Sequence, residues 1–293
     1  MSVSIRDYDR VADRIRQHRQ ADTRPVVVVE GPTDARFLRA GFDDKYVVFP
    51  CGTRSTALDA TAQLVAWGIE GAACVVDRDF DSVVTEREAE GLPVFAYENA
   101  DLEAMISQTD AFHLMVLEIG SEKKIKDAGG PRALVRIVQE IVVSVARLRA
   151  ANCRNGWGLA FDQVDLSSKV SLRSLSFNLS GYCAALRQAT QDSPPLGTLI
   201  SVADGTTPIR PEPSCPRRSF PYYRGRDFLA AAGVGLRHQF GSCQKAATDP
   251  EHLAGVLRAI ASKSVRDSEW GKDFERFIEG LHKNRTARIP RPR

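Results

Sequence analysis

The sequence predicts an α/β protein, in which a parallel sheet near the N-terminus is followed by a mainly helical region. Short apolar runs rich in valine occur at residues 26–29, 46–49 and 72–76. Segments with helical periodicity separate them. Continuous apolar runs are typical of strands buried on both faces, and their alternation with helices indicates βαβ units. We therefore expect a Rossmann-like parallel sheet.

The chain is expected to fold in four successive segments. Thr33 is expected to cap the first helix after the first strand, and a second helix is expected at 55–67. A further strand at 93–97 and a helix at 102–106 complete the predicted sheet domain. The segments are an N-terminal helical segment at 1–23, the sheet domain at 24–110, a mainly helical basic domain at 111–282, and a basic tail at 283–293 that is expected to be disordered. The amphipathic pattern of the first segment covers 3–20. In the helical domain we expect helices at 131–151, 225–232 and 251–263 and a proline-rich loop at 192–221.

Composition points to a globular protein in the cytoplasm. The chain has 293 residues, of which 43% are hydrophobic and 26% charged. Its apolar runs fall far short of the roughly 20 residues that cross a bilayer, and the N-terminus lacks the apolar core of a signal peptide. The six cysteines show neither CxxC nor Cys/His spacing, so neither a disulfide framework nor a structural zinc site is expected.

Charge is unevenly divided along the sequence. Residues 1–110 contain 12 Lys/Arg and 20 Asp/Glu, whereas residues 111–293 contain 28 and 17. An acidic first part fits a site that gathers carboxylates around a cation, and a basic second part fits a surface that meets phosphates. Chance partition of surface charge is the alternative.

Carboxylates follow the predicted strands at the positions where a ligand site is expected. Glu30 ends the first strand, Gly52 follows the second, and Asp77 and Asp79 follow the third. Ligand sites in parallel α/β sheets lie at the carboxyl ends of the strands. In an extended segment Asp77 and Asp79 point the same way, so both could bind one Mg²⁺ ion.

These residues carry a resemblance to a known family. The motif from Glu30 to Asp34 with Phe37 and Leu38, then Gly52, then Asp77-Arg78-Asp79, resembles the TOPRIM signature. Topoisomerases, DnaG-type primases, small RNA-maturing nucleases and OLD-type nucleases share that signature, and the resemblance covers roughly residues 24–107. It implies a TOPRIM fold, a general acid/base or metal-linked base at Glu30, and Mg²⁺ or Mn²⁺ bound by Asp77 and Asp79.

Other acidic residues extend the implied metal site. Asp34 corresponds to a carboxylate that helps to hold a second metal in OLD-type nucleases, and Asp81 and Glu98 are expected to add to the ligand shell. Each has a simpler interpretation: Asp34 stabilises a helix N-terminus, Asp81 lies in a turn, and Glu98 starts a helix. A looser resemblance, through residues 77–81, 97–99 and 225–229, is to TOPRIM subunits of ATPase-coupled anti-phage defence systems of the PARIS type.

Arginines are the candidates for nucleic-acid contacts. Lys45 is the single lysine among residues 1–110, so the catalytic lysine of some TOPRIM nucleases has no counterpart, and Arg54 or Arg78 could supply the positive charge. Aromatic and basic residues are mixed over 217–226, where stacking and phosphate contacts could combine. The arginines there are Arg217, Arg218, Arg224 and Arg226. Loop packing or a partner interface is the alternative for this segment.

The expected function is that of a Mg²⁺-dependent TOPRIM endonuclease acting on RNA, such as tRNA, or on DNA. The resemblance implies an anti-phage effector controlled by an ABC/OLD-type ATPase partner. No Walker motif occurs in the chain, so nucleotide use would belong to that partner. A homodimer is left open, and no membrane contact is expected. The alternatives are a non-catalytic TOPRIM-like binding or regulatory subunit and a housekeeping RNA-maturation nuclease.

Overall fold

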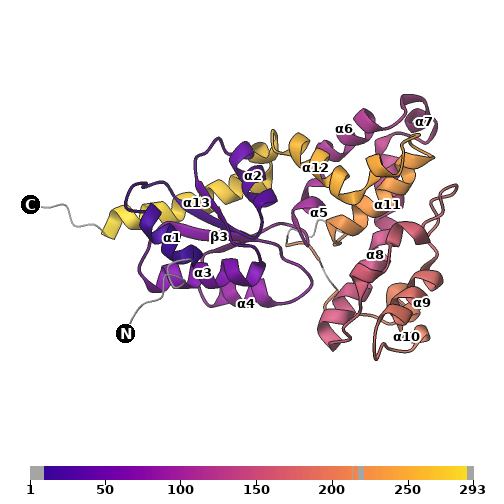
Figure 1. Ribbon diagram of the computed structural model, residues 1–293, viewed down its shortest axis with the longest axis horizontal. Helices are drawn as coiled ribbons and strands as arrows, with labels where there is room; N and C mark the ends of the chain where they lie inside the picture. Colours follow the sequence, from indigo (N-terminus) through magenta and orange to yellow (C-terminus); the bar gives the residue numbers. More distant parts are fainter. Residues whose placement is uncertain (1–9, 213, 217–220, 289–293) are drawn as a thin grey trace, which may run out of the picture. The chain divides into compact units, whose positions relative to one another are not determined.

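The computed structural model describes residues 10–212, 214–216 and 221–288, and side chains up to residue 281 (Figure 1). The chain divides into two compact units. Unit 1 takes its described residues from Met1–Arg78, Ser82–Tyr97 and Ser262–Arg293. Unit 2 comprises Asp79–Asp81 and the described part of Glu98–Ala261.

Unit 1 is built on a four-stranded parallel sheet in the order β2-β1-β3-β4. Its first strand consists of four valines, all fully buried, as a strand covered on both faces requires. The elements of unit 1 are α1 (Val11–His18), β1 (Val26–Val29), α2 (Pro32–Gly41), β2 (Val47–Pro50), α3 (Arg54–Ala66), β3 (Ala72–Val76), α4 (Val83–Ala89), β4 (Val94–Ala96), a 3₁₀ turn η5 (Val265–Asp267) and α13 (Glu269–Arg288).

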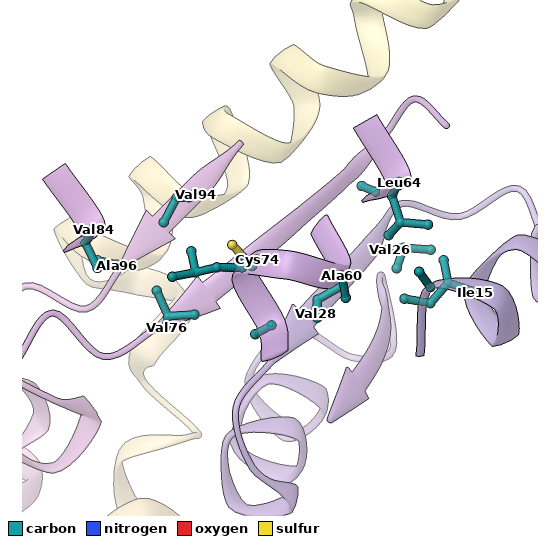
Figure 2. Close-up of a cluster of buried hydrophobic side chains, with 14 residues drawn as sticks. Ile15, Val26, Val28, Ala60, Leu64, Cys74, Val76, Val84, Val94 and Ala96 are labelled. Atoms are coloured by element: carbon teal, nitrogen blue, oxygen red, sulfur yellow. The ribbon is translucent and has the colours of Figure 1, made fainter. Parts of the chain in front are cut away.

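One face of the sheet packs against α1, α3 and α4. Alternate residues of the strands point to this face, and Figure 2 shows them meeting side chains of the three helices. Ile15 of α1 and Leu64 of α3 have no exposed surface in this cluster. The buried strand residues that contribute are Val26, Val28, Ala72, Cys74, Val76, Val94 and Ala96.

The other face is covered in part by α13, which comes from the C-terminal end of the chain (Figure 1). Trp270 donates from Nε1 to the carbonyl oxygen of Ala96 at 3.1 Å and is 4% exposed. Phe95 of β4 contacts the rings of Trp270 and Phe274, with centroids 5.5 and 5.6 Å apart. Phe274 also meets Phe42 at the end of α2. Helix α13 therefore belongs to the core of unit 1.

Unit 2 is helical and is organised around the long helix α8. Its core includes buried leucine and valine residues of α8 that pack against α9, α10 and α11. Its elements are α5 (Leu102–Ile106), α6 (Asp110–Ile119), α7 (Glu122–Asp127), α8 (Pro131–Asn155), η2 (Phe161–Gln163), η3 (Leu166–Lys169), α9 (Leu179–Ala189), α10 (Leu196–Ala203), α11 (Gly225–Arg237), η4 (Ala246–Thr248) and α12 (Pro250–Ala261).

The α/β class and the parallel sheet are confirmed, while several element boundaries differ. Helix α2 begins at Pro32, with Gly31 and not Thr33 at the cap position, because proline is well suited to the first helical turn. The helix predicted over 3–20 is found at Val11–His18, and residues 3–9 lie outside the described part.

The predictions for two C-terminal segments were wrong. Helix α10 lies within 192–221, because Pro194 and Pro195 precede its first residue, where proline does not break a helix. The segment after residue 282 continues α13 as far as Arg288, and residues 289–293 lie outside the described part. Residues 262–282 group with the sheet, not with the helical region.

The uneven charge along the sequence does not separate the two units. Among the described residues, unit 1 contains 18 Lys/Arg and 17 Asp/Glu, and unit 2 contains 17 and 18. Six acids of the first 110 residues, from Asp79 to Asp110, belong to the helical unit, and residues 262–288 add seven Lys/Arg and five Asp/Glu to the sheet unit. The argument for an acidic catalytic half and a basic binding half is therefore not supported by the fold.

The described residues contain no helix with the length and apolar character needed to cross a membrane.

We expect Trp270→Ala to lower the free energy of unfolding by about 3–5 kcal/mol, because it removes a large buried side chain. Trp270→Phe keeps an aromatic ring but loses the bond to Ala96, and should cost roughly 1–2 kcal/mol. Urea denaturation measures both, with exposed Lys272→Ala as the control on the same helix. A Trp270→Ala protein as stable as the Lys272→Ala control would contradict the assignment of α13 to the core.

Candidate functional site

Glu30 and Asp77 lie together at the carboxyl ends of adjacent strands. Glu30 follows β1 and Asp77 follows β3, and the two strands are paired in parallel register. Oε1 of Glu30 accepts a hydrogen bond from the backbone N–H of Asp77 at 2.9 Å. Both residues are partly exposed. The sequence predicted that these two acids would meet at one edge of the sheet, and the fold of unit 1 brings them together.

Gly52 lies beside Glu30 and contributes through its backbone. Its N–H donates to the carbonyl oxygen of Glu30 at 2.6 Å. Its φ of 99° lies in the region that favours glycine, and a Cβ there would meet nothing within 4 Å. Backbone conformation, and not lack of space, therefore accounts for glycine at this turn.

Asp34 is engaged in the structure of unit 1 through both carboxylate oxygens. Oδ2 accepts from the N–H of Gly31 at 3.0 Å, which closes the first turn of α2. Oδ1 accepts from the hydroxyl of Tyr97 at 2.9 Å. Tyr97 is buried and stacks on Trp270, so this bond joins the helix start to the end of β4 and to α13. These contacts give Asp34 a structural task that the sequence alone did not distinguish from a metal-binding one.

Arg54 and Arg78 both interact with backbone carbonyls near the strand ends. Arg54, at the start of α3, donates from Nη1 to the carbonyl oxygen of Arg78 at 3.3 Å. Arg78 donates from Nε to the carbonyl oxygen of Tyr97 at 3.3 Å. Arg54 therefore brings positive charge to the segment that follows Asp77.

The backbone leaves the extended conformation at Asp79, whose φ of 50° lies in the left-handed region. Strand alternation therefore does not continue through Asp79 and gives no reason for its carboxylate to point the same way as that of Asp77. Asp79 also groups with unit 2: its N–H donates to the carbonyl oxygen of Ala100 at 2.8 Å, and its own carbonyl accepts from the hydroxyl of Tyr222.

The remaining predicted acids belong to unit 2. Asp81 is exposed and Glu98 is partly exposed. Of the six candidate acids, unit 1 holds Glu30, Asp34 and Asp77, and unit 2 holds Asp79, Asp81 and Glu98.

The carboxylate oxygens of Glu30 and Asp77 are of the type that binds a hard cation such as Mg²⁺. Glu30 and Asp77 offer carboxylate oxygens from neighbouring strand ends, and such oxygens are the ligands Mg²⁺ prefers. Over residues 10–212, 214–216 and 221–288, no group of three or more His, Cys, Asp and Glu side chains is arranged to hold a metal ion. Magnesium commonly binds through only one or two carboxylates and completes its shell with water and substrate phosphate, so a two-carboxylate site is consistent with Mg²⁺.

The basic and aromatic segment over 217–226 differs from the predicted nucleic-acid contact. Tyr222 and Tyr223 are 4% and 0% exposed, so neither ring is available to stack on a base. Arg224 pairs with Asp162 at 3.6 Å, and Arg226 is exposed in the first turn of α11. Arg217 and Arg218 lie outside the described residues.

Two buried polar residues that follow β4 were missed by sequence reasoning. Asn99 and Asp101 are 1% and 6% exposed and bond to backbone atoms of residues 221–225. Burial raises the pKa of Asp101 to about 7, a shift that the bonds from Ala104 and Gly225 oppose. An acid immediately before a short helix signalled the cap at Asp101, but nothing in the sequence signalled its second partner, 124 residues away.

A double-mutant cycle tests the role of Asp34. We expect Asp34→Ala and Tyr97→Phe each to lower the free energy of unfolding by about 1–2 kcal/mol, with a double mutant less destabilised than the sum, because both remove one shared bond. Exposed Asp59→Ala is the control. Fully additive losses, together with a Mg²⁺-induced rise in Tm that Asp34→Ala alone abolishes, would make Asp34 a metal ligand instead.

No protein-family model matches this chain, and a search of curated proteins finds no match.

Proposed function

We propose that this protein is a Mg²⁺- or Mn²⁺-dependent endonuclease acting on nucleic acid. The observation that supports this proposal most is the pairing of Glu30 and Asp77 at adjacent strand ends, through the 2.9 Å bond from the Asp77 N–H to Glu30 Oε1. The carboxyl edge of a parallel sheet is where this class of fold binds ligands. The resemblance to the TOPRIM signature, carried by the same residues, supplies the reaction class.

Asp77 and Glu30 would hold the cation at the strand ends of unit 1. A divalent ion bound there would stabilise charge on a phosphodiester and activate water for attack. The bond from the Asp77 N–H restricts the rotation of the Glu30 carboxylate. A carboxylate with a fixed orientation is suited to receiving a proton from water or to orienting the water.

Positive charge for the substrate phosphate would come from Arg54. Its guanidinium lies at the carbonyl of Arg78, directly after Asp77, and so beside the proposed cation site. An arginine guanidinium in this place could bind a phosphate oxygen through charge-assisted hydrogen bonds. This would replace the lysine that the resemblance leads one to expect.

The substrate would be RNA, including tRNA-like molecules, or DNA, and the setting an anti-phage defence system with an ABC/OLD-type ATPase partner. Support for this part comes from the sequence motifs and from the absence of a Walker motif in the chain itself. A housekeeping role in RNA maturation would use the same site, and co-purification with an ATPase separates the two.

We expect Glu30→Gln to reduce metal-dependent cleavage by about 10²-fold or more, because the amide retains volume but cannot accept a proton. The measurement is single-turnover cleavage of labelled RNA and DNA with Mg²⁺ or Mn²⁺, with the fold verified by circular dichroism. Glu88→Gln, an exposed acid on α4, is the matched control and should cleave like the wild type.

Two outcomes would count against this function. Equal cleavage by wild-type and Glu30→Gln proteins would exclude Glu30 from the reaction. A wild-type protein that binds nucleic acid without cleaving it under any divalent metal would instead favour the non-catalytic alternative, a binding or regulatory subunit.

A further inference from the structure

Unit 2 contains a cavity of about 400 Å³ that runs along one face of α11. Its lining comes from α8, from the segment that holds η2 and η3, from α11 itself and from the residues that lead into α12. Every residue that lines it belongs to unit 2, so the cavity is a feature of that unit alone. Cavities of roughly 300–1,000 Å³ are the usual size of small-molecule sites.

A buried ion pair forms one part of the cavity wall. Arg149 donates from Nε to Oδ2 of Asp227 at 2.7 Å and from Nη2 to Oδ1 at 2.9 Å. The guanidinium also lies over the ring of Phe161, with its carbon atom 4.3 Å from the ring centroid. The exposed fractions of the Arg149 and Asp227 side chains are 12% and 11%. Because two bonds fix their geometry and their charges offset each other, the pair provides a defined wall without net charge.

Three further basic side chains line the cavity, and two of them lie towards the same end. Arg226 and Arg237 are on one face of α11, about 16 Å apart along its axis, because eleven residues make close to three helical turns. Lys245 comes from the segment before η4, which packs on the second half of α11: a Cβ at Gly233 would lie 2.5 Å from the carbonyl oxygen of Thr248. Arg237 and Lys245 therefore line the end of the cavity near the C-terminus of α11, and Arg226 lines the opposite end.

The acidic residues around the cavity are engaged by neighbouring groups, whereas the three basic side chains are not paired with acids. Asp162 pairs with Arg224 at 3.6 Å. Asp165 and Asp249 each accept a bond from a backbone N–H at 2.9 Å. Within residues 10–212, 214–216 and 221–288, no carboxylate forms an ion pair with any of the three basic side chains. Their positive charge is therefore available to an anionic ligand.

We propose that this cavity binds a phosphate monoester, with the phosphate on Arg237 and Lys245 and the organic part of the ligand extending towards Asp162. Guanidinium and ammonium groups donate charge-assisted hydrogen bonds to phosphate oxygens. Asp162 lies at the other end because it pairs with Arg224, directly before α11, and its 79% exposed side chain can accept bonds from hydroxyl or amino groups. Between the two ends, Ala230 presents only a methyl group. The inference uses no residue of the proposed cation site and is independent of it.

Calorimetric titration of the full chain at constant ionic strength tests this site, with adenosine monophosphate, glucose 6-phosphate and inorganic phosphate as probes. The two esters separate a nucleotide from a sugar phosphate, and inorganic phosphate measures the phosphate contacts alone. The variants are Arg237→Gln, Lys245→Gln and Asp162→Asn, with the fold verified by circular dichroism. Arg132→Gln and Lys123→Gln are the matched controls, because both are exposed basic residues of unit 2 that do not line the cavity.

At least one ester is expected to bind about tenfold more tightly than inorganic phosphate, because only an ester reaches both ends of the cavity. Arg237→Gln and Lys245→Gln should each raise its Kd about tenfold, the scale of one lost charge-assisted hydrogen bond, with both controls within about twofold of wild type. Asp162→Asn should weaken binding of the ester but not of inorganic phosphate. The proposal is overturned if neither ester binds, if neither binds more tightly than inorganic phosphate, or if the three cavity variants leave the Kd of the ester unchanged.

Discussion

Burial of both faces of a short parallel sheet is the constraint on which the rest of unit 1 depends. The four valines of β1 have no exposed surface, so helices must cover the sheet above and below. Residues 11–89 supply α1, α3 and α4 for one face. The other face requires α13, whose Trp270 and Phe274 come from the far end of the chain. A C-terminal helix therefore completes the fold that holds Glu30 and Asp77.

Sequence patterns predicted the strands and helices whose formation depends mainly on neighbouring residues. The valine-rich runs predicted the strands, the bounds of β3 and α5 agree with the structure, and the periodic apolar residues predicted α8. Helix α13 was missed as part of the sheet domain because its docking depends on contacts such as Trp270 with Ala96, 174 residues apart in sequence. Composition alone assigned its basic end to a disordered tail. The division of charge along the sequence also failed to predict the units, because acids such as Glu98, Asp101 and Glu103 belong to the helical unit and not to the sheet unit.

The sequence predicted that Glu30 and Asp77 meet, but it did not predict the conformation of Asp79. Parallel register places residues that follow adjacent strands side by side, which is why Glu30 and Asp77 meet as expected. Asp79 could not be predicted in this way, because the contacts with Ala100 and Tyr222 that accompany its left-handed backbone are distant in sequence. Asp34 shows that a motif position can have a structural task, since Gly31 and Tyr97 engage both of its oxygens.

The central claim is that Glu30 and Asp77 form part of a divalent cation site. Crystals of the protein soaked in Mn²⁺ test it most directly, because the anomalous signal of manganese locates the ion without reference to activity. The account predicts an anomalous peak within about 2.0–2.4 Å of a carboxylate oxygen of Asp77, the usual distance for a hard cation, and close to Glu30. Manganese bound elsewhere on the protein, with no density at this strand edge, would contradict it.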